Sequence, residues 1–222
     1  MKIGTYYCIP DIHGVHNLLQ KALNFIYDKN PNGGKIVFLG DYIDRGPDNL
    51  GVLDTVMNPP AYWDFICLKG NHESMFVDSY MNRSKFYDMH AAIEISGVQN
   101  AKTYKEVYDA IDPEIVRWMS NLPIFHIEEN NVFAHAYYND DLNPEEQNEH
   151  ICLWERLGDS EKYWNDNQGF YLTHGHTPRM NGPISAPNRI NLDAGAVFYD
   201  RLVIAEYKTG VQGPVGFHEF NR

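Results

Sequence analysis

Short apolar runs alternate with helix-spaced apolar positions along the first part of the chain. The runs at 6–9, 36–39 and 65–68 are uninterrupted and short, which is typical of buried strands. Residues 15–26 repeat apolar side chains at helical spacing after the first run, and residues 50–57 do so after the second. This alternation predicts parallel strands joined by helices, with functional side chains in the loops at the carboxyl ends of the strands.

The rest of the chain has a different pattern. Residues 82–122 are mostly helical and polar, so we expect a lid or cap inserted into a single domain that spans 1–222. Residues 123–136 predict a hairpin, and the acidic stretch 138–150 predicts a long surface loop. Several short strands, separated by Gly and Pro turns, are expected between 170 and 220. The change from alternating elements to mostly strands indicates a second sheet packed on the first.

Composition and charge narrow the class of protein. The chain has 222 residues, of which 43% are hydrophobic and 22% charged, as expected for one soluble domain with a substantial core. The formal charge of −12 argues against nucleic acid as a partner, because that role usually shows a basic stripe. No apolar stretch reaches the roughly 18 residues that a membrane span needs.

The N-terminal residues show no basic leader followed by a long apolar region. We therefore expect a cytoplasmic enzyme without a membrane partner. Of the three cysteines, Cys8 and Cys67 lie in apolar runs and Cys152 is far from both. This spacing predicts buried, reduced thiols, not a disulfide scaffold.

Three polar blocks follow the predicted strands directly. They are Pro10-Asp11-Ile12-His13-Gly14, Gly40-Asp41-Tyr42-Ile43-Asp44-Arg45-Gly46 and Gly70-Asn71-His72-Glu73. Their carboxylate, amide and imidazole groups suit a pair of manganese, iron or zinc ions better than calcium. Two such ions, roughly 3.5–4 Å apart, would acidify a bridging water and neutralise an attacked phosphoryl group. Each block alone could instead supply helix caps and a surface histidine, but the ordered set favours a metal pair.

The same blocks resemble the signature of the phosphoprotein phosphatase family of metallophosphoesterases, and in particular the compact bacteriophage lambda protein phosphatase type. The resemblance extends over about residues 6–206 and is specific only at the motifs. It implies an α/β calcineurin-like fold, in which two mixed β-sheets are sandwiched between helices. It also implies a dinuclear metal site at the edge of the sheets, with Mn²⁺ as the expected ion and Fe or Zn as alternatives.

The resemblance also assigns metal ligands. The segment that ends at His135 and the segment Gly175-His176-Thr177-Pro178 match two later family motifs that each supply a histidine. Spacing alone does not separate His176 from His174, and the Gly-His-Thr context favours His176. The implied ligands of the first ion are Asp11, His13 and Asp41, and those of the second are Asp41, Asn71, His135 and His176.

The resemblance makes His72 the general acid and Asp44 the residue that orients it. A carboxylate behind a histidine fixes its tautomer, so the residue types suit these roles. Arg45 could present its planar guanidinium to two phosphate oxygens. Arg156 resembles the second phosphate-binding arginine of the family. Ordinary alternatives are a pairing of Asp44 with Arg45, and a surface contact of Arg156 with its neighbours.

Two departures from the family pattern are visible. Pro10 stands where the family usually has glycine, and this residue fixes φ and could re-aim Asp11 slightly. Ala136 and Tyr137 follow His135 in place of a small or acidic pair, which bears on substrate preference. The segment 191–197 resembles a late family strand beside the site, and we interpret it as structural support.

These features predict a metal-dependent phosphatase. We expect it to hydrolyse phosphomonoesters, chiefly phosphoserine and phosphothreonine in proteins, by direct attack of a hydroxide that bridges the two ions. Its partners would be a phosphorylated protein or a small phosphoester. A phosphodiesterase or nuclease of the same fold fits less well, because Asp44-Arg45-Gly46 favours the phosphatase branch. A non-catalytic scaffold is disfavoured because every candidate residue is present.

The main alternative is a hydrolase of dinucleoside polyphosphates, which shares these motifs in a related branch. Several aromatic residues could stack on a base in such an enzyme. They are Tyr137, Tyr138, Trp154, Tyr163 and Trp164. Packing in the core or in a lid is the simpler interpretation of these side chains.

Overall fold

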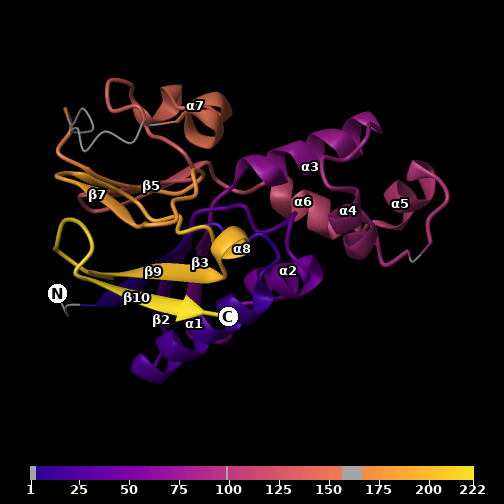
Figure 1. Ribbon diagram of the computed structural model, residues 1–222. Helices are drawn as coiled ribbons and strands as arrows, with labels where there is room; N and C mark the ends of the chain where they lie inside the picture. Colours follow the sequence, from indigo (N-terminus) through magenta and orange to yellow (C-terminus); the bar gives the residue numbers. More distant parts are fainter. Residues whose placement is uncertain (1–3, 99, 157–166) are drawn as a thin grey trace.

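Two sheets stacked face to face form the body of the protein. The computed structural model describes residues 4–98, 100–156 and 167–222. Sheet A has the strand order β10-β9-β1-β2-β3, and sheet B has the order β4-β5-β6-β8-β7. Figure 1 shows helices outside the two sheets and a further group of helices extending to one side.

The strands of sheet A are β1 (Thr5–Ile9), β2 (Gly34–Phe38), β3 (Trp63–Cys67), β9 (Arg201–Lys208) and β10 (Gly216–Asn221). Those of sheet B are β4 (Phe125–Glu128), β5 (Asn131–Ala134), β6 (Tyr171–His174), β7 (Ile184–Ala186) and β8 (Arg189–Asn191). The helices are α1 (His16–Lys29), α2 (Asn49–Met57), α3 (Asn71–Asn82), α4 (Met89–Ser96), α5 (Tyr104–Ala110), α6 (Pro113–Ser120), α7 (Glu149–Trp154) and α8 (Ala196–Tyr199). A short 3-10 helix covers Pro144–Glu146.

Strand β1 shows why the first apolar runs are uninterrupted. Tyr7 and Ile9 belong to the core cluster that also contains the apolar face of α1. Tyr6 and Cys8 point to the other side and join Phe133 of β5 in a second cluster between the sheets. Both faces of sheet A are therefore covered, which is the setting in which strands read as continuous apolar runs.

The direction of the strands places the functional loops. Strand β2 runs parallel to β1 and to β3, and β6 runs parallel to β5 and to β8. Strands β9 and β10 in sheet A, and β4 and β7 in sheet B, pair in the antiparallel direction. Both sheets are thus mixed, as the family resemblance implied. The carboxyl ends of parallel strands lie along one edge of a sheet, so the loops after these strands come together there.

The helical group on one side is built from α4, α5 and α6, as the polar helical pattern over 82–122 predicted (Figure 1). Each helix begins at a side-chain cap, supplied by Asp88, Thr103 and Asp112 respectively. Phe86 and Tyr108 pack with ring centroids 5.0 Å apart and belong to the same core cluster as α1. The lobe is therefore continuous with the core below sheet A.

The predicted strands lie where the apolar runs placed them, with ends shifted by one or two residues. The second sheet is present, but β9 pairs with β1 and β10 pairs with β9, so both strands extend sheet A. The prediction of a surface loop over 138–150 was partly wrong. Tyr138 and Asp140 are buried there, because Tyr138 packs against Phe125 and Phe170 on the outer face of sheet B.

All three cysteines are buried free thiols, as the apolar runs predicted for Cys8 and Cys67. Burial raises the pKa of Cys67 to about 12 and that of Cys152 to about 12. Among the described residues, none of the helices is both long and apolar enough to cross a membrane.

Candidate active site

The predicted site residues come from the loops that follow five of the parallel strands. In sheet A, Asp11 and His13 follow β1, and Asp41, Asp44 and Arg45 follow β2. Asn71 and His72 come after β3 and begin α3. In sheet B, His135 follows β5 and His176 follows β6. All of these side chains except Arg45 are at least nine-tenths buried. The strand ends therefore bring together residues that lie up to 165 positions apart in the sequence.

The backbone at these positions is strained. Five predicted site residues adopt a left-handed conformation, with φ of 47° at His13, 53° at Asp41, 72° at Asp44, 71° at Arg45 and 68° at His176. Each such conformation costs a non-glycine residue roughly 1–2 kcal/mol. Strain of this kind persists where the surrounding structure enforces it, and it gathers at functional sites.

Glu73 holds the loop after β2 in place. Its carboxylate is fully buried and accepts hydrogen bonds from the backbone amides of Gly70, Asp41 and Tyr42 at 2.9–3.0 Å, and from that of Ile43 at 3.4 Å. Burial raises the pKa of Glu73, while the nearby His72 and these amides lower it. Gly70 lies so close to Asp41 that a Cβ there would stand 2.1 Å from its Oδ1. The start of α3 and the Asp41 loop are thus fitted to each other.

Replacing Glu73 with alanine should therefore destabilise the protein by roughly 3 kcal/mol or more. The substitution leaves buried backbone N–H groups without an acceptor. Chemical denaturation followed by tryptophan fluorescence measures the loss. Glu145→Ala, at an exposed position on the 3-10 helix, is the matched control and should shift stability by less than about 0.5 kcal/mol. Equal stabilities of the two variants would show that Glu73 does not hold this loop.

One group of possible metal donors contains His13, Asp41 and His72. His13 Nε2 lies 3.4 Å from Asp41 Oδ2, and His72 Nε2 lies 4.0 Å from the same oxygen. His13 Nδ1 donates to the backbone oxygen of Ile43 at 2.8 Å. That bond places the proton of a neutral imidazole on Nδ1 and leaves the lone pair of Nε2 facing the site.

The second group contains Asp41, His135 and His176, with Asn71 beside them. His135 Nε2 lies 3.4 Å from Asp41 Oδ2, 2.9 Å from Asn71 Oδ1 and 3.1 Å from His176 Nδ1. Asn71 Oδ1 lies 3.0 Å from His176 Nδ1. The Oδ2 atom of Asp41 thus lies equally far from His13 and His135, which places it between the two groups.

The chemistry of these donors fits a pair of divalent cations. His135 Nδ1 donates to the backbone oxygen of Leu39 at 3.0 Å, so the lone pair of its Nε2 faces the amide oxygen of Asn71. Burial and the neighbouring His176 lower the pKa of His135 well below its usual value, which keeps the ring neutral. Burial and the nearby carboxylates of Asp11 and Glu73 raise the pKa of Asp41. Lone pairs and carboxylates gathered in this way need positive charge among them.

Asp11 lies next to these groups but in neither of them, as far as the described residues go. Both of its carboxylate oxygens accept from the backbone amide of His176 at 3.1 Å. Burial and the neighbouring Asp193 raise the pKa of Asp11. Asp193 itself accepts from the amide of Gly195 at 2.8 Å and so supports the start of α8. The role of Asp11 as a ligand stays a prediction.

His72 and Asp44 form a close pair. His72 Nδ1 and Asp44 Oδ2 are 2.5 Å apart. Burial, together with the charge of Arg45, lowers the pKa of His72 to about 4. Burial, together with Asp88, raises the pKa of Asp44 to about 8. Both shifts favour a neutral pair that shares one proton between Nδ1 and Oδ2, and the other imidazole proton stays on Nε2, which faces Asp41.

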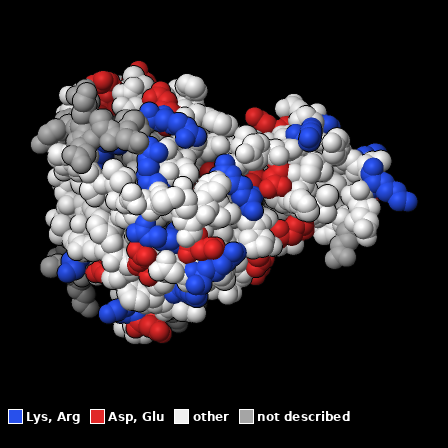
Figure 2. Space-filling view, in the orientation of Figure 1, with Lys and Arg blue, Asp and Glu red and all other residues white. Residues whose placement is uncertain are grey.

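The two predicted phosphate-binding arginines lie in different surroundings. Arg45 Nη1 donates to His13 Nε2, and its guanidinium lies 5.4 Å from the ring centroid of Phe198. Arg156 is exposed just after α7, and its charge is near enough to lower the pKa of His176. Figure 2 shows Lys and Arg side chains spread over the middle of this face among acidic ones, although the chain as a whole is acidic.

Other predicted candidates lie elsewhere. His174 ends β6, and its Nε2 is 3.5 Å from Arg189 Nη1, whereas His176 lies past the strand end and joins the second donor group. The two histidines thus do not share a strand face, contrary to the spacing argument. Tyr138 is buried in the core, as the packing interpretation predicted, and Trp154 is 41% exposed at the end of α7. Tyr163 and Trp164 lie outside the described residues.

Sequence reasoning missed Glu73 and two exposed aromatic residues. Tyr87 is 60% exposed, and its ring meets the edge of His72 with centroids 5.0 Å apart. Phe198 is 53% exposed and covers Arg45. Glu73 belongs to a quoted motif and could have been recognised as the carboxylate of a capping box. Tyr87 lies in a segment without a motif. Phe198 directly follows the segment 191–197, which the resemblance placed beside the site but which we interpreted as structural support.

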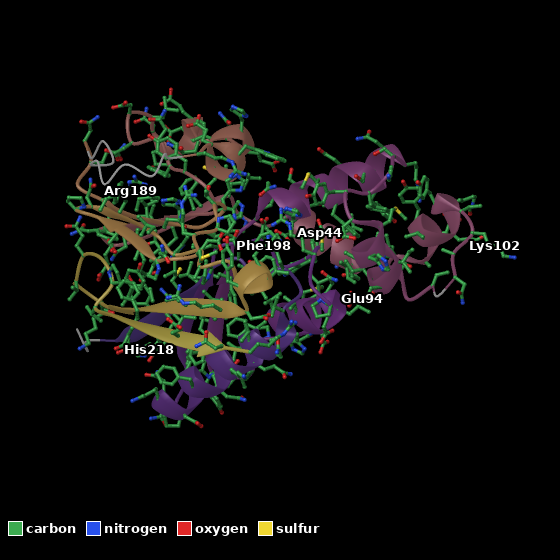
Figure 3. All side chains as sticks on the ribbon, in the orientation of Figure 1. Asp44, Glu94, Lys102, Arg189, Phe198 and His218 are labelled. Atoms are coloured by element: carbon green, nitrogen blue, oxygen red, sulfur yellow. The ribbon has the colours of Figure 1, made fainter. Side chains whose placement is uncertain are left out.

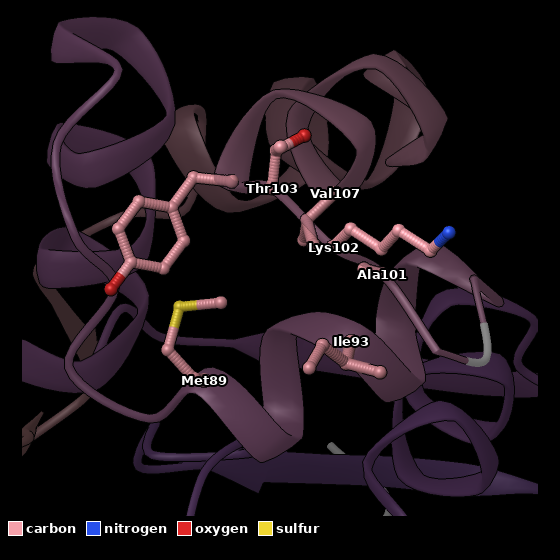
Figure 4. Close-up of a pocket in the computed structure, with 7 residues that line it drawn as sticks. Met89, Ile93, Ala101, Lys102, Thr103 and Val107 are labelled. Carbon is pink, nitrogen blue, oxygen red and sulfur yellow. The ribbon is translucent and has the colours of Figure 1, made fainter.

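Two cavities differ in their relation to these residues. A cavity of about 620 Å³ opens beside Arg45, between α2, α4 and α8, and Val197 of α8 and Arg222 also line it. A cavity of about 570 Å³ lies within the helical lobe and is lined by Met89, Ile93 and Val107 among others (Figure 4). Among the described residues, neither lining includes a member of the two donor groups, but the first cavity is lined by Arg45, which donates to His13.

Comparison with known proteins identifies the family. The model of the calcineurin-like phosphoesterase family matches residues 4–201, so the chain belongs to this family. The fold is that of calcineurin-like metallophosphoesterases, with two mixed sheets flanked by helices. Members of this class use divalent metal ions, and the convergent His and Asp donors described above are candidate ligands for such ions.

Proteins that are similar to this chain are named for different activities. The chain is 26% identical to the asymmetrical bis(5′-nucleosyl)-tetraphosphatase PrpE of Anoxybacillus flavithermus, over 91% of this chain and 90% of that protein. It is 27% identical to serine/threonine-protein phosphatase 1 of Salmonella typhimurium, over 89% of each. The fold also matches the crystal structure of a cold-active protein-tyrosine phosphatase from a psychrophilic Shewanella species, with a TM-score of 0.65, 16% identity, and coverage of 96% of this chain and 81% of that one.

Proposed function

We propose that this metallophosphoesterase hydrolyses dinucleoside polyphosphates. The observation that carries a phosphoester hydrolase is the pair of donor groups that share Asp41, with Arg45 beside them. The similarity to the bis(5′-nucleosyl)-tetraphosphatase, which covers nine-tenths of both chains, supports a nucleotide substrate. The alternative derived from the sequence thus has stronger support than the expected preference for phosphoproteins.

Each site residue has a role in this proposal. His13 and Asp41, with Asp11, would hold one divalent ion, and Asp41, Asn71, His135 and His176 would hold the second. When bound, the ions supply an activated water and offset the charge of the attacked phosphate. The mixed nitrogen and oxygen donors suit manganese, with iron or zinc as alternatives.

The remaining residues handle the phosphates and the proton. Arg45 and Arg156 would bind non-bridging phosphate oxygens through paired N–H donors. Water adds to one phosphorus, the bond to the neighbouring bridging oxygen breaks, and that oxygen takes a proton from Nε2 of His72. The proton shared between Asp44 Oδ2 and His72 Nδ1, which are 2.5 Å apart, moves to Nδ1 as Nε2 gives up its own proton, so the imidazole stays neutral and Asp44 becomes a carboxylate.

A protein phosphatase is the second candidate. The similarity to the Salmonella serine/threonine-protein phosphatase covers as large a share of both chains as the similarity to the tetraphosphatase does. A phosphoserine or phosphothreonine side chain would present the same kind of phosphoryl group to the donor groups.

A product-resolved assay distinguishes the two candidates. The manganese-loaded protein is incubated separately with diadenosine tetraphosphate and with a phosphothreonine peptide in ¹⁸O-labelled water. We expect kcat/KM to be at least roughly tenfold higher for the dinucleotide. The products, either ATP with AMP or two molecules of ADP, identify which bond is cleaved, and the labelled product identifies the attacked phosphorus. Faster release of phosphate from the peptide would contradict the proposed substrate class.

A further inference from the structure

Phe198 presents an exposed aromatic ring next to the proposed phosphate-binding Arg45. The ring is 53% exposed, although phenylalanine is normally buried, and it covers the guanidinium of Arg45 at 5.4 Å. In Figure 3, Phe198 lies beside Asp44, the residue that precedes Arg45, in the centre of the molecule. The ring thus lies close to where a bound phosphate would be held.

The short helix that carries Phe198 is firmly anchored. Asp193 accepts from the amide of Gly195, and the amide of Phe198 donates to the oxygen of Gly195 at 2.9 Å. Gly195 has a φ of 74°, and a Cβ there would stand 2.6 Å from the ring of Tyr199. Ala196 is buried beneath this turn. The backbone of Phe198 is therefore held in place before any ligand binds, which lowers the entropic cost of stacking.

The cavity beside Arg45 has the size and the chemistry of a nucleoside site. Its volume of about 620 Å³ falls within the range of roughly 300–1,000 Å³ that is typical of small-molecule sites. Arg45 lies at its wall, and Asp88 and Glu94 supply carboxylates elsewhere in the lining. Figure 3 shows Glu94 on the helical side of this region.

The carboxylates of this cavity are fixed in position. Glu94 accepts from the side-chain amide of Asn49 at 2.6 Å and from the backbone amide of Leu50 at 2.9 Å. Asp88 accepts from the backbone amide of Arg45 at 2.9 Å and caps α4. Carboxylate oxygens accept hydrogen bonds, so they suit ribose hydroxyls or the amino group of a base and repel a second phosphate.

From this arrangement we infer that Phe198 is a stacking platform for a nucleobase, and that the cavity beside Arg45 holds the attached ribose. The inference rests on the proposed function in one respect, since Arg45 must hold a phosphate of the same nucleotide. A single nucleotide would then have its phosphate at Arg45, its base on the ring of Phe198, and its ribose hydroxyls toward the carboxylates of Asp88 and Glu94. Phe198 thereby sets specificity for nucleotides over simple phosphoesters.

A pair of non-hydrolysable probes tests this assignment without relying on turnover. Adenosine 5′-(α,β-methylene)diphosphate and methylenediphosphonate differ only in the nucleoside, and isothermal titration to the manganese-loaded protein gives the ratio of their dissociation constants. Stacking of one base on an aromatic ring predicts a ratio of roughly tenfold or more. Phe198→Ala should reduce that ratio to near one, while Phe198→Tyr should retain it.

The ratio of the two dissociation constants distinguishes stacking of the base on Phe198 from an indirect effect of Phe198 on the position of Arg45. Both probes use Arg45, so a shift of the arginine changes both affinities equally and leaves the ratio intact. Phe217→Ala is the matched control. Neither Phe217 nor Phe198 lines the cavity itself, but Phe198 lies against Arg45 and adjoins the lining residue Val197, whereas Phe217 is 45% exposed on β10. This control should leave the ratio as in the parent protein.

Several results would overturn the assignment. One is a parent ratio near one, and another is a ratio that survives Phe198→Ala and is lost in Tyr87→Ala, which would move the base next to His72. A third is an unchanged ratio together with weaker binding of a phosphothreonine peptide by Phe198→Ala, which would make the cavity a peptide site. Failure of the proposed function is distinct, since a Phe198-dependent ratio without cleavage of diadenosine tetraphosphate would leave the base site standing.

Discussion

Replacing Asp41 with asparagine should lower turnover of the manganese-loaded protein by roughly a thousandfold or more. Asp41 Oδ2 lies 3.4 Å from both His13 Nε2 and His135 Nε2, so one oxygen serves both donor groups. An amide lacks the charge that a shared ligand supplies. The metal pair accounts for several kcal/mol of transition-state stabilisation, and each 1.36 kcal/mol is a factor of ten in rate. Steady-state kinetics and metal analysis of the purified variant measure both effects.

In the metal-free protein, the same substitution should not lower the thermal stability. The carboxylates of Asp11 and Glu73 lie near Asp41, and together with burial they raise its pKa. Asparagine removes one of these charges and keeps an acceptor for the amide of His72, which bonds to Asp41 Oδ1 at 3.0 Å. In EDTA the variant should melt no lower than the parent.

Asp54→Asn, at an exposed position on α2, is the matched control and should retain activity and metal content. Two equivalents of manganese with unimpaired turnover in Asp41→Asn would remove Asp41 from the centre of the site. A large loss of thermal stability in EDTA would show instead that Asp41 acts as a structural residue.

Replacing His72 with asparagine should lower kcat by roughly a hundredfold to ten-thousandfold and leave metal content unchanged. Proton transfer by a positioned side chain contributes about this much to a reaction rate. The loss should shrink for substrates with better leaving groups, since these need less protonation. Comparing aryl phosphates of graded leaving-group pKa, with metal content measured on the same samples, tests both parts of the prediction.

The geometry makes this experiment decisive for His72. Its Nε2 lies within 4.0 Å of Asp41 Oδ2, so the position is also compatible with a metal ligand. Parallel losses of metal and activity in His72→Asn would reassign His72 as a ligand. His150→Asn, at an exposed position on α7, should change neither. Asp44→Asn should give a smaller decrease of roughly ten- to a hundredfold, because it acts through the orientation of His72.

Much of the fold was predictable because the pattern of apolar residues in each segment agrees with the burial of that segment in the folded protein. The uninterrupted apolar runs became β1, β2 and β3, since sheet A is buried on both faces. The place of β9 and β10 was not predictable, because β9 pairs with β1 across nearly the whole chain and β10 is then added to β9. Helix α8 has four residues, which is too short for a periodic pattern.

The candidate site also contains residues that were predictable from the sequence and residues that were not. Asp41, His135 and His176 come together, as the motifs and the family resemblance predicted. His135 and His176 follow the parallel neighbours β5 and β6 of sheet B, and Asp41 reaches them from the loop after β2 of sheet A. Their roles as ligands stay predictions until a metal is located. Tyr87 reaches the site only through tertiary packing, and the resemblance of the segment 191–197 to a family strand does not extend to a role for Phe198, which follows it. Helical periodicity and strand alternation predict elements of secondary structure, but they do not predict where one exposed aromatic side chain lies.

The site also breaks rules that the rest of the chain follows. Buried carboxylates, left-handed residues such as Asp44 and Arg45, and facing lone pairs all cost stability. The chain offsets part of this cost through Glu73, whose carboxylate ties the loop after β2 to the start of α3. Such conflicts between local preference and structure are expected where a protein binds charged ligands.

Anomalous diffraction from manganese-soaked crystals tests the central claim most directly. The account predicts two peaks on either side of Asp41 Oδ2, roughly 3.5–4 Å apart. One should be bound by His13 and the other by Asn71, His135 and His176. A single peak, or ions bound away from Asp41, would contradict the proposed dinuclear site.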